Sequence, residues 1–250
     1  MLEVTLIDNR EYLNIIFSIL NEIEQTQVAN IERSASVIKE TIDKGGVLHV
    51  FSTGHSHMFV EEMFYRTGGL VPVNPIFDPA TMPHEGALKS TKMERLPGYA
   101  KIILENYETR EGEPILIISN SGINVVPVEM AMVAKEKSMK VIVVTSLNIS
   151  EEASPRHPSG LKLYNLGDII IDNCIKDSDA SIKIPETGQR VAAVSTITGA
   201  YIIQRIVIST VNKFLEKGET PPIFMSANVN GGYEFNEPLL NKYKSRIKGF

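Results

Sequence analysis

A chain of 250 residues is long enough to bury the core of one large α/β domain or of two small ones. Its formal net charge of −5 provides no basic surface, which argues against nucleic acid as a partner. The single cysteine, Cys174, excludes an internal disulfide framework and is typical of a reducing compartment. We find neither a signal peptide at Met1 nor an apolar run long enough to cross a bilayer, so we expect a cytoplasmic protein without a membrane partner.

The first part of the chain has the apolar spacing of amphipathic helices. Between residues 6 and 44, apolar side chains such as Ile19 and Ile23 recur every three or four positions. The glycine pair that begins at Gly45 is a helix stop signal. We therefore predict that residues 1–45 form a helical N-terminal extension.

Runs of apolar residues alternate with helical patterns in the rest of the chain. The predicted strands are Val47–Phe51, Leu70–Val73, Ile115–Ile118, Lys140–Ser146 and Asp168–Asp172. Strands separated by helices favour a parallel sheet with helices on both faces, which is a three-layer α/β sandwich with five parallel strands. We predict a single domain over residues 1–250, with its α/β core at 46–217 and a C-terminal tail at 218–250.

The predicted helices include Met58–Arg66, a strongly apolar helix at Val191–Leu215 and a short basic helix near Leu239–Lys248. The stretch 74–97 carries four prolines and the tripeptide His84-Glu85-Gly86. It is too long and too polar for a plain connection, and long loops at such positions are often functional.

Small polar residues follow two of the predicted strands directly. The first loop is Ser52-Thr53-Gly54-His55-Ser56, and the second is Ser119-Asn120-Ser121-Gly122-Ile123-Asn124. A helical pattern follows each loop, so backbone N–H groups and hydroxyls converge at the positive end of a helix dipole. This arrangement suits a phosphate, although an ordinary serine–glycine turn with a helix N-cap explains each loop taken alone.

Other site chemistries have weaker support in the sequence. Neither a dinucleotide fingerprint, a P-loop nor a nucleophile elbow is present. His55, His57 and Glu61 have a partial metal-ligand spacing, but a hydrogen-bonding or solvated role is commoner for such histidines. We therefore predict no metal and no cofactor.

The two loops resemble those of the sugar isomerase (SIS) domain family, in which loops of these types bind a sugar phosphate. A third stretch, Pro185–Thr196, resembles the Glu-bearing segment that leads into a long helix in that family. The resemblance covers about residues 29–215 and implies a flavodoxin-like or Rossmann-like topology. It also implies phosphosugar-binding roles for a set of residues in the two loops, namely Ser52, Gly54, His55, Ser56, Ser119, Asn120, Ser121 and Asn124.

The resemblance leads to three functional hypotheses. The first is an aldose–ketose isomerase of a phosphorylated sugar, with Glu186 as base, Glu85 as the alternative base and His84 as acid–base partner. The second is a sugar-phosphate-binding regulatory module without catalysis. The third is a phosphosugar lyase of the etherase type, which begins with the same proton abstraction. Because related SIS domains are dimers and the helices of this chain are strongly apolar, we also expect a homodimer or homotetramer.

Overall fold

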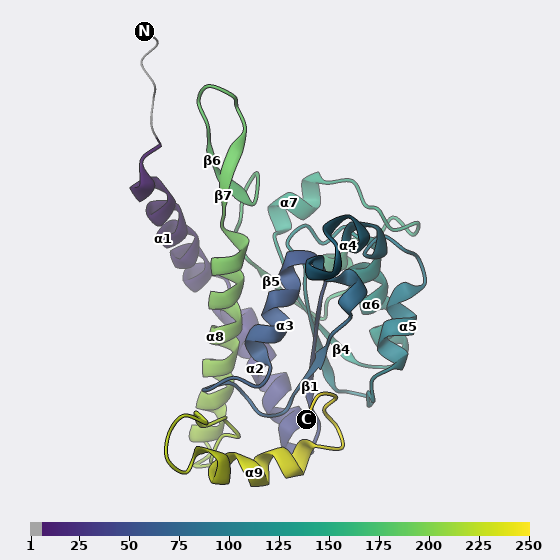
Figure 1. Cartoon of the computed structure of the whole chain (residues 1–250), viewed down its shortest axis with the longest axis vertical. Coiled ribbons are helices and arrows are strands. Elements are labelled where there is room, and N and C mark those ends of the chain that lie inside the picture. The colour runs from purple at the N-terminus through teal and green to yellow at the C-terminus, as the bar shows by residue number, and fades with distance from the viewer. Residues whose placement is uncertain (1–6) are drawn as a thin grey trace.

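The computed structural model describes residues 7–250, which form a parallel sheet with helices on both faces (Figure 1). Residues 1–6 of the predicted N-terminal extension lie outside the described part of the chain. The rest of the extension is helical, as predicted, and forms α1 (Asn9–Thr26) and α2 (Val28–Asp43). The two helices meet at Gln27, which is the C-cap of the first and the N-cap of the second.

The central sheet has five strands in the order β2-β1-β3-β4-β5, and every neighbouring pair is parallel. The strands are β1 (Leu48–Ser52), β2 (Val73–Ile76), β3 (Pro114–Ile118), β4 (Lys140–Thr145) and β5 (Ile169–Asp172). The predicted three-layer α/β fold is confirmed. The strand order reverses between β1 and β3, and in open α/β sheets ligands bind beyond the carboxyl ends of the strands at such a switch point.

One predicted strand is displaced along the chain. The strand expected at Leu70–Val73 begins only at Val73. Leu70 instead forms an isolated antiparallel bridge with Ile223, and the backbone N–H of Val71 donates to Pro222 at 2.9 Å. The C-terminal tail therefore satisfies the backbone groups of this buried apolar run.

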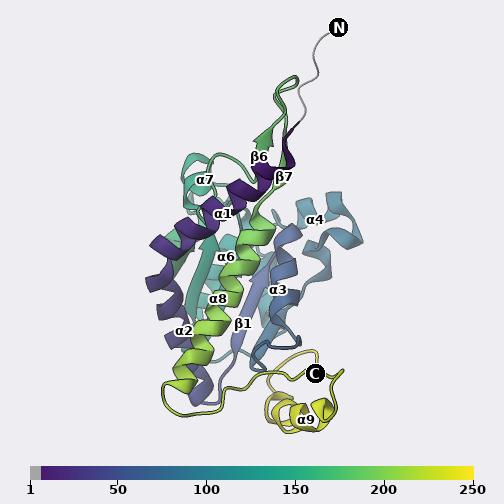
Figure 2. The same ribbon diagram turned by 90° about the vertical axis from the view of Figure 1, so that its left-hand side faces the viewer.

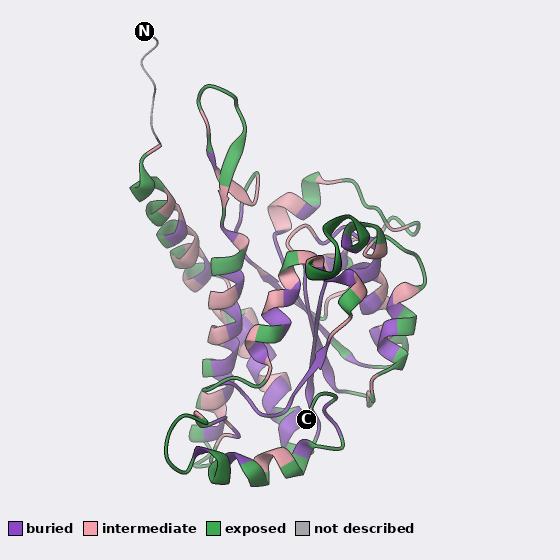
Figure 3. Ribbon diagram, in the orientation of Figure 1, coloured by how far each residue is buried: buried purple, intermediate pink, exposed green. Residues whose placement is uncertain are grey.

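Helices cover the two faces of the sheet because the side chains of each strand alternate between them. On one face, Leu116 and Ile118 of β3 pack with α1, α2, α3 (Met58–Met63) and α8 (Ser195–Leu215), which lie together in Figure 2. On the other face, Ile115 and Ile117 pack with α5 (Tyr99–Glu105) and α6 (Val125–Glu136). The strands are therefore almost wholly buried (Figure 3).

The stretch expected to be a long polar loop contains helices. It forms η2 (Pro79–Thr81), η3 (Pro83–Glu85) and α4 (Ala87–Met93). Two further short helices, α7 (Leu147–Glu152) and η4 (Leu163–Leu166), lie before and after the loop that leads towards β5. The helix α4 lies at the same end of the sheet as α7 (Figure 1).

The long apolar helix begins later than predicted. Residues 180–193 form a two-stranded hairpin, β6 (Ala180–Lys183) and β7 (Arg190–Ala193), which projects from the body of the molecule beside α1 (Figure 1). The helix α8 starts at Ser195 because the carboxylate of Asp179 accepts hydrogen bonds from the backbone N–H groups of Val194 and Ser195 and from the hydroxyl of Ser195. The prediction of a helix from Val191 is therefore wrong at its start, because β7 occupies the first residues of that range.

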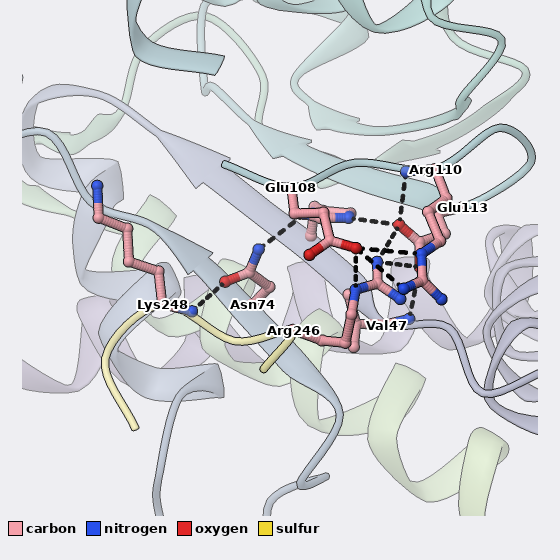
Figure 4. Close-up of polar contacts among 8 residues, drawn as sticks. Val47, Asn74, Glu108, Arg110, Glu113, Arg246 and Lys248 are labelled. Atoms are coloured by element: carbon pink, nitrogen blue, oxygen red, sulfur yellow. Dashed lines mark hydrogen bonds and ion pairs between the residues drawn. The ribbon is translucent and has the colours of Figure 1, made fainter. Parts of the chain in front are cut away.

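The C-terminal segment closes the opposite end of the sheet. Its helix α9 (Gly232–Tyr243) begins earlier than the basic helix predicted near Leu239–Lys248. Beyond it, Arg246 forms a buried ion pair with Glu113 at 2.8 Å and reaches Glu108 at 3.0 Å (Figure 4). This contact ties the tail to the residue that precedes β3.

None of the helices within residues 7–250 is long and apolar enough to cross a membrane.

Candidate functional site

A polar pocket of about 330 Å³ lies at the carboxyl ends of β1 and β3, and we call it the strand-end pocket. Every predicted phosphosugar-binding residue except Ser52 lines this pocket. The predicted residues that line it are Gly54, His55, Ser56, Ser119, Asn120, Ser121 and Asn124. The structure therefore brings together at one switch point two loops that lie far apart in the sequence.

The first loop turns out of β1 into the short helix η1 (Gly54–His57). Gly54 adopts a left-handed φ of 59°, which residues with a Cβ rarely take. Thr53 and Ser56 line the pocket, whereas Ser52 does not, because its buried hydroxyl donates to the carbonyl oxygen of Ile118. Ser52 thus links β1 to β3 and lies outside the pocket lining, and its phosphate contact stays a prediction.

The second loop is held in one conformation by its own polar groups. Gly122 has a φ of 63°, and a Cβ added there would lie 2.8 Å from the hydroxyl oxygen of Thr145. The Ser119 hydroxyl accepts the N–H of Gly122 at 3.3 Å, and the Asn120 side-chain oxygen accepts from Asn173 at 2.8 Å. The loop therefore presents its hydroxyl and amide groups to the pocket without reorganisation.

A carboxylate that the sequence analysis missed faces this pocket. Glu94 is the C-cap of α4 and is half-buried in the pocket wall. Its carboxylate accepts a hydrogen bond from the Thr53 hydroxyl at 3.1 Å, and the side chain of Asn124 lines the same pocket. Burial raises the pKa of Glu94 above its ordinary value, because the effect of desolvation exceeds the lowering by the Thr53 and Asn124 side chains.

The pocket contains a second carboxylate, but three hydrogen bonds commit it to capping a helix. Asp179 accepts the backbone N–H of Ser195 at 2.8 Å and the Ser195 hydroxyl at 2.9 Å, so it caps the start of α8. Glu94 is therefore the pocket carboxylate that is better placed for chemistry.

The structure does not place the predicted catalytic residues in the strand-end pocket. Glu186 is exposed in the turn between β6 and β7, and not at the start of α8 as expected. His84 and Glu85 are exposed on η3, where Glu85 pairs with Lys89 at 3.0 Å. The ring of His84 lies 5.5 Å from the ring of His57. None of these three candidates lines the pocket within its own chain.

The histidines of the first loop differ in their surroundings. His55 is exposed at the pocket, whereas His57 is buried, with Nδ1 2.8 Å from the Gly54 carbonyl oxygen and Nε2 3.3 Å from Glu61. Both ring nitrogens of His57 therefore face protein oxygens. Within residues 7–250, no three His, Cys, Asp or Glu side chains are grouped in a way that could hold a metal ion.

The fold and the two polar loops define a domain class, and comparison with known proteins identifies it. The family model described as the SIS domain matches residues 11–146, so the chain belongs to the SIS domain family. The chain is 39% identical to a UPF0309 protein of Thermoanaerobacter pseudethanolicus over 95% of this chain and 98% of that one. It is also 39% identical to a UPF0309 protein of Listeria innocua, over 94% of this chain and 96% of the relative.

Solved structures with a similar fold include two phosphoheptose isomerases. The enzyme from Francisella tularensis has a TM-score of 0.54 at 17% identity and covers 81% of this chain and 96% of its own. The enzyme from Neisseria gonorrhoeae has a TM-score of 0.53 at 14% identity and covers 83% of this chain and 96% of its own. At these identities the similarity is one of fold.

Proposed function

We propose that this protein binds a phosphorylated sugar in the strand-end pocket and catalyses its aldose–ketose isomerisation by proton transfer. One observation carries the proposal: a half-buried carboxylate, Glu94, faces the same pocket as two loops rich in hydroxyl and amide groups. The chemistry requires a fixed phosphate and a base beside the C1–C2 edge of the sugar, and the pocket has residues suited to both tasks.

The phosphate belongs on the side of the pocket formed by the second loop. Ser119 and Ser121 supply hydroxyls there, at the start of α6, and Ser56 lines the pocket from the first loop. No lysine or arginine of residues 7–250 lines the pocket, so neutral donors and the helix dipole have to supply the positive potential. Repulsion between like charges would keep the phosphate away from the Glu94 carboxylate.

Glu94 is the base in this proposal. In the open-chain aldose it takes the proton from C2 while the carbonyl oxygen gains a proton, which yields an enediol. The proton then returns to C1, and the C2 hydroxyl loses its proton to give the ketose. Burial raises the pKa of Glu94 above its ordinary value, which makes the carboxylate a stronger base.

His55 is the residue best placed to transfer the protons on oxygen, because it lines the pocket and its side chain is exposed to solvent. An imidazole can donate and accept a proton near neutral pH, which ring opening and the enediol step both need. In this role His55 replaces His84, which lies outside the pocket lining.

A screen of sugar phosphates in D2O, followed by NMR, tests the proposal. An isomerase incorporates deuterium at C1 or C2 of its substrate, even where the equilibrium hides net conversion. We expect exchange with at least one phosphorylated sugar and none with the matching free sugar. If sugar phosphates bind but none exchanges a C–H proton, the protein is a binding module and the isomerase proposal is wrong.

A further inference from the structure

Arg156 contacts the pocket wall from outside the pocket. It lies on the exposed loop that follows α7, and its backbone N–H donates to the Ile123 carbonyl oxygen at 3.2 Å. Its guanidinium donates to the side-chain oxygen of Asn124, a residue that is 8% exposed. An arginine on a surface loop thus contacts a buried amide of the strand-end pocket.

That contact fixes the orientation of the Asn124 amide. Asn124 occupies the N-cap position of α6, where an asparagine side chain usually accepts a backbone N–H of the first turn, but here it makes no such bond. The Glu94 carbonyl oxygen accepts the N–H of Val126 at 3.0 Å instead. With its oxygen bound by Arg156, the Asn124 side chain has its NH2 group as the remaining donor, and Glu94 lines the same pocket. The Asn124 side chain also lowers the pKa of Glu94.

The helix α6 contacts both the segment that bears Glu94 and the loop that bears Arg156. Glu129 of α6 accepts the backbone N–H of Gly98 at 2.8 Å, which holds the segment that follows Glu94. Glu129 also lies 3.5 Å from the Nε2 atom of His157, the neighbour of Arg156. The loop that bears Arg156 and the segment that bears Glu94 are therefore held against one helix.

We propose that Arg156 is a positioning residue, which orients Asn124 so that its NH2 group donates to the Glu94 carboxylate and holds that carboxylate in the pocket. The proposal rests on the proposed function, because it names a residue that acts on the base through a third side chain. Arg156 is distinguished from Arg95, the other arginine whose charge acts on Glu94, by its hydrogen bond to Asn124. Arg95 therefore offers a matched control for charge alone.

The test is a carbon-13 NMR titration of the glutamate carboxyl groups, with the Glu94 signal assigned by its loss in E94Q. We expect R156Q to raise the titration midpoint of Glu94 by about 0.5–1 pH unit, and R95Q to raise it by less than half of that. R156K should keep the titration midpoint of Glu94 close to that of the wild type, because an ammonium can also donate to the Asn124 oxygen. In the N124A background, R156Q should raise the titration midpoint of Glu94 by no more than R95Q does.

Equal shifts in R156Q and R95Q, or an undiminished effect of R156Q in N124A, would overturn the proposal, because Arg156 would then act by charge alone. The titration needs no substrate, so it judges Arg156 even if the protein exchanges no sugar proton. With a substrate, R156Q should lower the exchange rate about tenfold, because the loss of carboxylate alignment outweighs the gain in basicity that a higher pKa brings. It should leave the phosphate-dependent thermal shift unchanged. Loss of that shift in R156Q would make Arg156 a substrate ligand and would also contradict its positioning role.

Discussion

The hydroxyl of Thr53 donates a hydrogen bond to the carboxylate of Glu94 across 3.1 Å, although the two residues are 41 positions apart in the sequence. Thr53 directly follows β1, whereas Glu94 ends α4. The contact joins the first polar loop to the proposed base. It therefore makes the segment between β2 and α5 part of the site and not merely a connection.

The first prediction concerns the phosphate. A sugar phosphate present at about 100 times its Kd should raise the free energy of unfolding by about 2.7 kcal/mol. Removal of the Ser121 hydroxyl in S121A should weaken this response, because the hydroxyl lines the phosphate side of the pocket. Thermal shifts with paired phosphorylated and free sugars measure the effect, and S245A, at an exposed position outside the pocket, is the control.

Two results would contradict this prediction. One is an equal thermal shift from the phosphorylated and the free member of every pair that binds. The other is a response to sugar phosphate in S121A that matches that of the wild type.

The second prediction concerns the glycine of the second loop. Gly122 and Gly160 both have a left-handed φ, but only at Gly122 does an added Cβ meet a neighbour within 4 Å. We expect G160A to cost about 1 kcal/mol from backbone strain. G122A should cost about 1–3 kcal/mol more, because the Cβ would overlap Thr145, and it should also abolish the ligand-dependent thermal shift. Equal unfolding free energies for the two variants in urea would show that the loop has room for a Cβ.

The third prediction concerns acid stability. Burial tends to raise the pKa of Glu113, but hydrogen bonds from His49 and Arg246 lower it to about 2. A carboxyl group whose folded pKa is depressed stabilises the fold above its unfolded pKa, and this stabilisation is lost as the pH falls. The wild type should therefore lose stability between about pH 4.5 and about pH 2.

The variant E113Q tests this directly. It should cost about 3–5 kcal/mol at neutral pH, because it removes the buried one of the two carboxylates that pair with the buried Arg246. It should also flatten the dependence of the unfolding free energy on pH over the stated range. E108Q removes the more exposed partner of Arg246 and serves as the control, with a much smaller effect. A pH profile of E113Q that parallels the wild type would contradict the assignment.

The fourth prediction concerns assembly, which we propose to be a homodimer or a tetramer of closed symmetry. Leu13 and Phe17 on α1 are 52% and 56% exposed, and Ile208 and Leu215 on α8 are 48% and 58% exposed. Such apolar side chains on two packed helices suit a subunit interface.

Light scattering at micromolar concentration should therefore give at least twice the monomer mass of 27.7 kDa. F17E should weaken the assembly, whereas I102E, at an equally exposed apolar position on the opposite layer, should not. A monomeric wild type would contradict the prediction.

The fold could be predicted because its strands are buried on both faces. The uninterrupted apolar run Ile115–Ile118 is typical of a strand at the centre of a sheet, where both faces are buried. The edge strand β2 was misplaced because the apolar residues before it are covered by the tail, a long-range contact that local patterning does not contain. The hairpin of β6 and β7 was missed for a similar reason, because Asp179 sets where α8 begins.

The two polar loops of the pocket were predictable from small polar residues that directly follow apolar runs, whereas the proposed base was not. Glu94 ends a helix without an apolar face: Leu88 is 81% exposed while Ser90 is buried. The periodicity that signals an amphipathic helix is absent there, although the segment Ala87–Met93 consists mostly of good helix formers. Helix propensity together with the carboxylate at its end was the only available signal.

The measurement that tests the account most directly is deuterium exchange into a bound sugar phosphate by E94Q, E186Q and E85Q. All three variants should keep the phosphate-dependent thermal shift. E94Q alone should lose C–H exchange, by about 100-fold or more, because an amide cannot take the proton. If E94Q exchanges at the wild-type rate while E186Q or E85Q does not, the base lies outside the strand-end pocket of its own chain and the account is wrong.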